Sequence, residues 1–173
     1  MRRSIPILLY HHVAPDREIT PRQFEAQMRS LLDRGYKSLS MDDLLGVIQG
    51  TVPLTTPAFA LTFDDGYSDN WGHAYPVLKE LGLRATIYLV TDKIGSDGFL
   101  SWEQIKSIAT SGLVTLGSHT RTHRHFVRKD PYEDLGEELL QSKDVIETRL
   151  DRACSGNWAR RGGRKATVRG CPY

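Results

Sequence analysis

A chain of 173 residues with 39% hydrophobic and 25% charged residues has the composition of one soluble globular domain and is too short for two of ordinary size. Its net charge of +2 is unevenly distributed. Residues 151–173 hold six basic residues and one acidic residue, whereas residues 1–150 hold 17 basic and 20 acidic residues. No segment approaches the roughly 20 apolar residues of a membrane helix, and the two cysteines have no Cys-x-x-Cys spacing. The composition therefore argues against a membrane-spanning protein and a disulfide scaffold.

The first half of the chain predicts two strands separated by two helices. Residues 5–10 form a short apolar run typical of a buried strand. Residues 20–35 begin with Thr-Pro, place apolar residues at helical spacing and end in Gly, which predicts a helix. Residues 40–50 predict a second, shorter helix in the same way. Residues 58–63 are an uninterrupted apolar run, so we expect a fully buried strand there.

The second half continues the alternation of strands and helices. Residues 68–81 carry apolar residues at helical spacing, and residues 85–90 form a third apolar run. A helix is expected over 101–111, followed by a fourth strand over 113–116. Asp-Pro then opens a long amphipathic helix over 130–150.

Strands that alternate with helices predict an α/β fold with a parallel sheet and right-handed connections. We expect about four βα units, which is about half of a (β/α) barrel. Residues 151–173 contain no Leu, Ile, Met or Phe, but four Gly and six basic residues. The sequence therefore predicts one domain over 1–150 and a disordered, Gly/Arg-rich tail over 151–173.

Two of the predicted strands end in side chains that suit a metal site. Asp64 and Asp65 follow the strand over 58–63, and His119 and His123 follow the strand over 113–116. In parallel α/β proteins the carboxyl ends of the strands carry the chemistry. If the segment after the fourth strand turns helically, the two imidazoles lie on one face, as in other metal-binding pairs four residues apart. The simpler alternatives are an Asp-Gly hairpin turn and a surface cluster of histidines.

Other candidate residues lie nearby in the predicted fold. His11 and His12 follow the first strand, so one of them can reach the same edge of the sheet, and Tyr67 follows the paired aspartates. We expect His11 and Tyr67 to line a substrate pocket. The simpler alternatives are a loop histidine bonded to the backbone for His11, and core or surface packing for Tyr67. The basic tail lacks interleaved aromatic residues, so we expect no nucleic-acid partner.

Two of these motifs resemble motifs one and two of the polysaccharide deacetylase family (NodB-homology, chitin deacetylase-like): Thr-Phe-Asp-Asp-Gly-Tyr at 62–67 and His-Thr-Arg-Thr-His at 119–123. Tyr-His-His-Val at 10–13 and Leu-Val-Thr-Asp at 89–92 resemble the branch that contains the exopolysaccharide poly-N-acetylglucosamine deacetylases. The similarity runs over about residues 5–150. It implies a distorted (β/α) barrel of the NodB-homology type, of which this chain holds the N-terminal part.

The resemblance also implies an activity. It makes Asp64 the catalytic base, and Asp65, His119 and His123 the ligands of a divalent metal, usually zinc. The implied reaction is hydrolysis of an N-acetyl group on an N-acetylglucosamine-type polysaccharide or oligosaccharide, by a metal-bound water that Asp64 activates. One departure from the family pattern is Arg124, which stands where the family usually has proline after the second histidine.

A larger departure is that the family's later arginine-proline and leucine-histidine motifs do not occur in this sequence. We therefore expect that truncation or a frameshift close to residue 151 has replaced the later strands of the barrel. Two alternatives stay open: an impaired remnant that binds metal or glycan without turnover, and an amidase for small substrates. With no signal peptide, the sequence as written predicts a cytoplasmic protein, whereas the resemblance implies the cell envelope or secretion if a signal was lost upstream. Neither the polymer nor the oligomeric state follows from the sequence.

Overall fold

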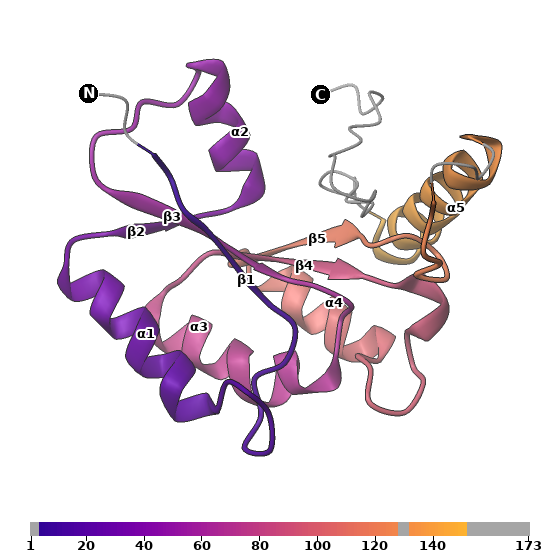
Figure 1. Cartoon of the computed structure of the whole chain (residues 1–173), viewed down its shortest axis with the longest axis horizontal. Coiled ribbons are helices and arrows are strands. Elements are labelled where there is room, and N and C mark those ends of the chain that lie inside the picture. The colour runs from indigo at the N-terminus through magenta and orange to yellow at the C-terminus, as the bar shows by residue number, and fades with distance from the viewer. Residues whose placement is uncertain (1–3, 128–131, 152–173) are drawn as a thin grey trace.

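The computed structural model describes residues 4–127 and 132–151, which form a parallel sheet with helices between its strands (Figure 1). The strands are β1 (Ile7–Tyr10), β2 (Lys37–Leu39), β3 (Ala58–Phe63), β4 (Ala85–Leu89) and β5 (Val114–Ser118). The helices are α1 (Pro21–Asp33), α2 (Met41–Gln49), α3 (Tyr75–Leu81), α4 (Trp102–Thr110) and α5 (Tyr132–Leu150), with a π-helix η1 (Asn70–Ala74) and a 3-10 helix η2 (Thr91–Lys93). The predicted α/β fold built from βα units is confirmed.

All strand pairs in the described residues are parallel, and the order along the sheet is β1-β3-β4-β5. β3 pairs with β2 through its first three residues and with β4 through its last two. Because the strands are parallel, the carboxyl ends of β1, β3, β4 and β5 all lie at one edge of the sheet. This edge is where the sequence places the paired aspartates and histidines.

The expectation of four strands is wrong, because β2 adds a fifth. Its residues, Lys-Ser-Leu, are too few to show an apolar pattern, and only one of the three is apolar. β2 forms because the chain leaving α1 runs beside β3, where the N–H of Lys37 donates to the carbonyl of Pro57 at 2.9 Å. A three-residue strand of this kind depends on its neighbour rather than on its own sequence.

β3 lies at the centre of the core, and β1 lies at its margin. Every residue of β3 is buried, and the side chains of Phe59, Leu61 and Phe63 are fully enclosed. β1 was expected to be buried as well, but Ile7 is 42% exposed and Leu9 is 54% exposed, so that expectation is wrong. Among the described residues β1 pairs with β3 alone, which leaves one of its edges and alternate side chains uncovered.

The helix expected over 68–81 forms, but part of it is a π-helix. This part is η1, in which the N–H of Tyr75 bonds to the carbonyl of Asn70, five residues earlier. Pro76 follows at once and has no N–H, so it cannot make the next helical hydrogen bond. α3 then continues as a regular helix and ends at Gly82, which has a left-handed backbone.

Two predictions fall on parts of the chain outside the described residues. The expected start of the last helix at residues 130–131 is one, since α5 is described from Tyr132 onward. Residues 152–173 of the predicted tail are the other. Within the described part of the chain, no helix is both long and apolar enough to cross a membrane.

The turn after β3 is shaped by close packing at Gly66. This glycine has a φ of +77°, and a Cβ atom added to it would lie 2.8 Å from the Cδ2 atom of Leu89. Gly35 has the same φ of +77° with no atom within 4 Å of such a Cβ. A side chain at Gly35 would therefore introduce backbone strain alone, whereas a side chain at Gly66 would introduce the same strain together with steric overlap.

We predict that Gly66→Ala destabilises the fold more than Gly35→Ala does. Strain alone should lower the free energy of unfolding by about 1–2 kcal/mol at Gly35, and overlap with Leu89 should add about 1–3 kcal/mol at Gly66. Urea unfolding followed by circular dichroism measures both losses. Equal losses would show that the turn yields to the added methyl group.

Candidate metal centre

Asp65 occupies the first turn after β3. Asp64 still follows the strand, since its N–H donates to the carbonyl of Tyr10 at 2.9 Å. Asp65 then adopts a φ of 72°, which is uncommon for a residue with a side chain. Its carbonyl accepts a hydrogen bond from the N–H of Val90 at 3.5 Å, so the turn is joined to the end of β4.

His119 and His123 lie in the segment that follows β5. The N–H of His119 donates to the carbonyl of Leu89 at 2.8 Å, which joins this segment to the end of β4 as well. Thr120 and His123 have φ values of 72° and 63°, and the N–H of His123 donates to the Thr120 hydroxyl at 3.1 Å. The helical turn that was considered for this segment does not form. The two rings nevertheless lie together, with centroids 5.0 Å apart.

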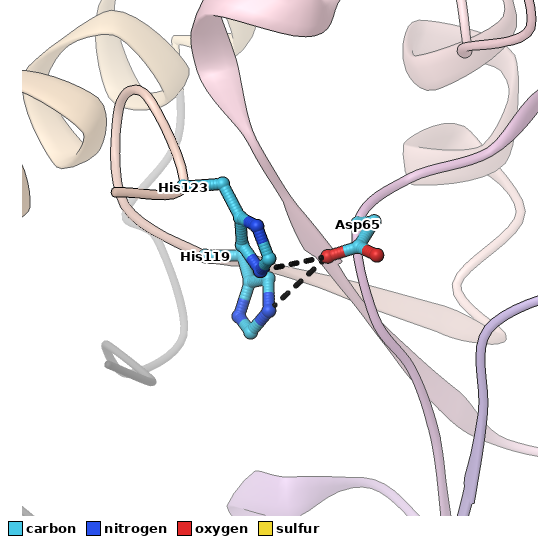
Figure 2. Close-up of side chains that lie close together, drawn as sticks. All are labelled: Asp65, His119 and His123. Atoms are coloured by element: carbon cyan, nitrogen blue, oxygen red, sulfur yellow. Dashed lines mark ion pairs between the residues drawn. The ribbon is translucent and has the colours of Figure 1, made fainter. Parts of the chain in front are cut away.

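The carboxylate of Asp65 faces both imidazole rings (Figure 2). Its Oδ1 atom lies 3.3 Å from Nε2 of His119 and 3.3 Å from Nε2 of His123. The side chains of Asp65 and His119 are only 9% and 7% exposed, whereas that of His123 is 51% exposed. The cluster is thus closed on the protein side and open toward solvent at His123.

These three residues fit a divalent cation. Burial raises the pKa of Asp65, but the close contact with His119 and the positive charges of His123, His119 and His11 outweigh it, so the pKa lies below its ordinary value. Oδ1 of Asp65 is buried and accepts no hydrogen bond from the described residues. One carboxylate oxygen and two imidazole nitrogens, all within 4.8 Å of one another, can bind one cation.

The far side of the His119 ring lacks the usual support. Its Nδ1 atom is buried and has no hydrogen-bond partner in the described part of the chain. Metal-binding histidines commonly donate this second N–H to a carboxylate or a carbonyl, which fixes the tautomer. Within the described residues, the orientation of His119 therefore depends on its backbone and on ring packing, with the Tyr88 ring centroid 6.4 Å away.

Asp64 lies next to the cluster without being one of its three members. Its Oδ2 atom is 3.9 Å from Nε2 of His119, and its side chain is 14% exposed. The left-handed backbone at Asp65 turns the two neighbouring carboxylates to different places. One of them faces both imidazoles, and the other lies at the margin of the same site.

The histidines after β1 differ in their surroundings. His11 is exposed, and its charge contributes to the low pKa of Asp65. His12 stacks on Tyr67 with ring centroids 3.7 Å apart, and its Nδ1 atom lies 2.6 Å from Oδ2 of Asp69. The role of Asp69 was not predicted, although it follows Tyr67 by only two residues.

Tyr67 is held between two rings. The ring of His12 stacks on the ring of Tyr67, and the ring of Phe99 also stacks on it, with centroids 4.9 Å apart. Burial raises the pKa of Tyr67, and the negative charge of Asp65 raises it further, so the phenol keeps its proton at neutral pH. The structure thus places Tyr67 beside His12 and within the electrostatic reach of Asp65.

A cavity of about 650 Å³ runs beside β1. Its wall includes Leu9, Tyr10, His11, His12 and Arg17, and it does not include the cluster of Figure 2. His11 belongs both to this wall and to the surroundings of Asp65. The cavity and the cluster are therefore neighbouring features rather than one pocket.

The sequence profile of polysaccharide deacetylases matches residues 51–169 of this chain. The chain belongs to the polysaccharide deacetylase family. Among curated relatives, it is 34% identical to YxkH of Bacillus subtilis (strain 168) over 146 residues, which are 83% of this chain and 52% of YxkH. It thus spans about half the length of YxkH.

Two further proteins show where this polysaccharide deacetylase chain falls among its relatives. It is 29% identical to the poly-beta-1,6-N-acetyl-D-glucosamine N-deacetylase of Escherichia coli (strain K12) over 109 residues, which are 54% of this chain and 16% of that protein. The solved structure of the Streptococcus pyogenes deacetylase PplD in complex with acetate superposes with a TM-score of 0.80 at 26% identity, covering 88% of this chain and 72% of that one.

We predict that the metal-free protein binds one Zn²⁺ ion per chain. Asp65→Asn and His123→Ala should each weaken binding by at least about 100-fold, because each removes one of three ligands. Isothermal titration calorimetry after treatment with a chelator measures the affinity. The matched control is His125→Ala, an exposed histidine two residues beyond the cluster, which should bind like the wild type. An equal loss in His125→Ala would contradict the assignment.

Proposed function

We propose that this chain is a metal-dependent deacetylase domain that hydrolyses the N-acetyl groups of an N-acetylglucosamine-type polysaccharide or oligosaccharide. The observation that carries the proposal is the meeting of Asp65 with His119 and His123 at the carboxyl edge of the sheet, with Asp64 beside them. Membership in the polysaccharide deacetylase family supports the same reaction class.

We propose Zn²⁺ as the cation, held by Oδ1 of Asp65 and Nε2 of His119 and His123. Two imidazoles and one carboxylate are a common ligand set of catalytic zinc, which keeps a further coordination position open. When bound, the cation supplies Lewis-acid polarisation of a carbonyl oxygen and lowers the pKa of coordinated water. The exposed side of His123 leaves an approach to this position from solvent.

Asp64 is the proposed general base. Its carboxylate lies at the margin of the cluster, 3.9 Å from the nearest imidazole nitrogen, and it is not needed to hold the cation. In this place it takes a proton from the attacking water and passes it to the leaving amine. Positioned proton transfer of this kind typically contributes about 10²–10⁴-fold to the rate.

The substrate pocket is proposed to lie over His11 and Tyr67. His11 connects the cavity beside β1 with the surroundings of Asp65. Tyr67 keeps its proton at neutral pH and so is able to donate a hydrogen bond to a sugar oxygen. Stacking against His12 and Phe99 holds this phenol ring in place.

We predict that the protein releases acetate from N-acetylglucosamine oligomers and that Asp64→Asn lowers the turnover number by about 10²–10⁴-fold. Zinc affinity should stay close to that of the wild type, because the three ligands are intact. Acetate release and calorimetry on the same samples measure both quantities. Asp97→Asn, an exposed aspartate in the loop before α4, is the matched control and should stay fully active.

The other outcomes of this experiment identify the alternatives. Hydrolysis of small N-acetylated amides without hydrolysis of oligomers would replace the proposal by a small-substrate amidase. Zinc binding with no turnover of either substrate would indicate a metal- or glycan-binding module. An Asp64→Asn variant with wild-type turnover would remove Asp64 as the base while leaving the reaction class in place.

A further inference from the structure

One face of α5 lies alongside the segment that carries the two histidines. Asp134, Glu138 and Ser142 are spaced four residues apart, so they lie in a row along the helix. Each of them contacts a different part of residues 118–124, and the helix and the segment run in opposite directions. Asp134 contacts the end of the segment, Glu138 its middle and Ser142 its start. Figure 1 shows α5 beside the carboxyl end of β5.

Glu138 makes the central contact. Its Oε2 atom accepts hydrogen bonds from the backbone N–H groups of Arg121 and Thr122 at 2.9 and 2.8 Å. Its Oε1 atom accepts a third from the hydroxyl of Thr122 at 2.8 Å. Glu138 is buried, and Nε of Arg121 lies 3.8 Å from the same carboxylate. A buried carboxylate with several donors and one cation is satisfied in place and holds its partners firmly.

The two outer contacts extend the row. Nη1 of Arg124 donates to Oδ2 of Asp134 at 2.9 Å on the exposed side. The hydroxyl of Ser142 contacts that of Ser118 in the interior, and the Ser118 hydroxyl accepts a hydrogen bond from the N–H of Thr120 at 3.1 Å. Both histidines therefore lie inside the stretch that α5 contacts.

The opposite side of the same segment is bound to η2. The N–H of Thr91 donates to the carbonyl of Thr120 at 3.3 Å, and the N–H of Asp92 donates to the carbonyl of Arg121 at 2.9 Å. Carbonyls of the segment are thus bound on one side and its N–H groups on the other. These bonds offset the unfavourable left-handed conformations at Thr120 and His123.

We propose that Glu138 is a positioning residue of the metal centre. By binding the two N–H groups between His119 and His123, it fixes the backbone that aims both Nε2 atoms at Asp65. The inference rests on the proposed metal centre, and it adds α5 to the elements that build it. Its consequence is that metal affinity depends on a side chain that is not one of the three ligands.

The experiment compares the wild type with Glu138→Ala and Glu138→Gln. Zn²⁺ alone is titrated into the metal-free proteins at a temperature at which circular dichroism shows all of them folded. We expect Glu138→Ala to bind Zn²⁺ about 10–100-fold more weakly, the range typical for residues that support metal ligands. Glu138→Gln keeps one acceptor oxygen and should restore part of the affinity. The visible spectrum of the Co²⁺-loaded proteins should change in Glu138→Ala, because the ligand geometry changes.

Hydrogen exchange in the metal-free proteins tests the contact itself. The amides of Arg121 and Thr122 should exchange faster in Glu138→Ala than in the wild type, because they lose their acceptor. The matched control is Glu137→Gln, an exposed carboxylate on the same helix, which should change neither exchange nor zinc affinity. If Glu138→Ala does not fold, Thr122→Val carries the test, since it removes one of the three donors and keeps the shape of the side chain.

The outcomes separate this inference from the proposed function. Wild-type zinc affinity in folded Glu138→Ala overturns the positioning role while the metal centre stands. An equal loss in Glu137→Gln overturns it too, because the effect would then be one of helix charge. A wild type that binds no zinc overturns the metal centre and this inference together.

Discussion

The negative charge of Asp65 is the feature on which the candidate site depends. A carboxylate buried to this extent is costly unless positive partners surround it, and here two imidazoles lie 3.3 Å from a single oxygen. The pairing requires that β3 and β5 end at the same height of the sheet. β4 sets that height, because Val90 bonds to the turn of Asp65 and Leu89 bonds to His119.

Parallel strand ends alone do not explain the site, since its second half is an irregular segment. That segment is bound by η2 through its carbonyls and by α5 through its N–H groups and hydroxyls. The candidate metal centre is thus built from five elements, β3, β4, β5, η2 and α5, and the three candidate ligands follow β3 and β5. The cavity beside β1 is a separate feature that meets this centre at His11.

Much of this arrangement follows from patterns in the sequence. Uninterrupted apolar runs predicted β3 and β4, and Ser or Thr caps with glycine stops predicted α1 and α2, because those signals are local. β2 and the exposure of β1 were not predictable, since both depend on which strand lies alongside. Residue type and spacing singled out the two aspartates and two histidines as candidates, and the family resemblance made Asp65 rather than Asp64 the candidate ligand. The segment between the histidines is not helical, so this part of the geometry was not predicted. Glu138 gave no signal, because one glutamate in an amphipathic helix looks like any solvated charge.

Left-handed backbone is concentrated where the chemistry is proposed. Among the described residues other than glycine, Asp65, Thr120, His123 and Asp151 have positive φ, and two of these are candidate ligands. Glycine or asparagine relieves such strain, so selection for thermal stability alone would favour replacing them. Stability screens of random variants would therefore enrich proteins that have lost candidate ligands. A library intended to improve this domain must keep Asp65 and His123 fixed or select for metal binding at the same time.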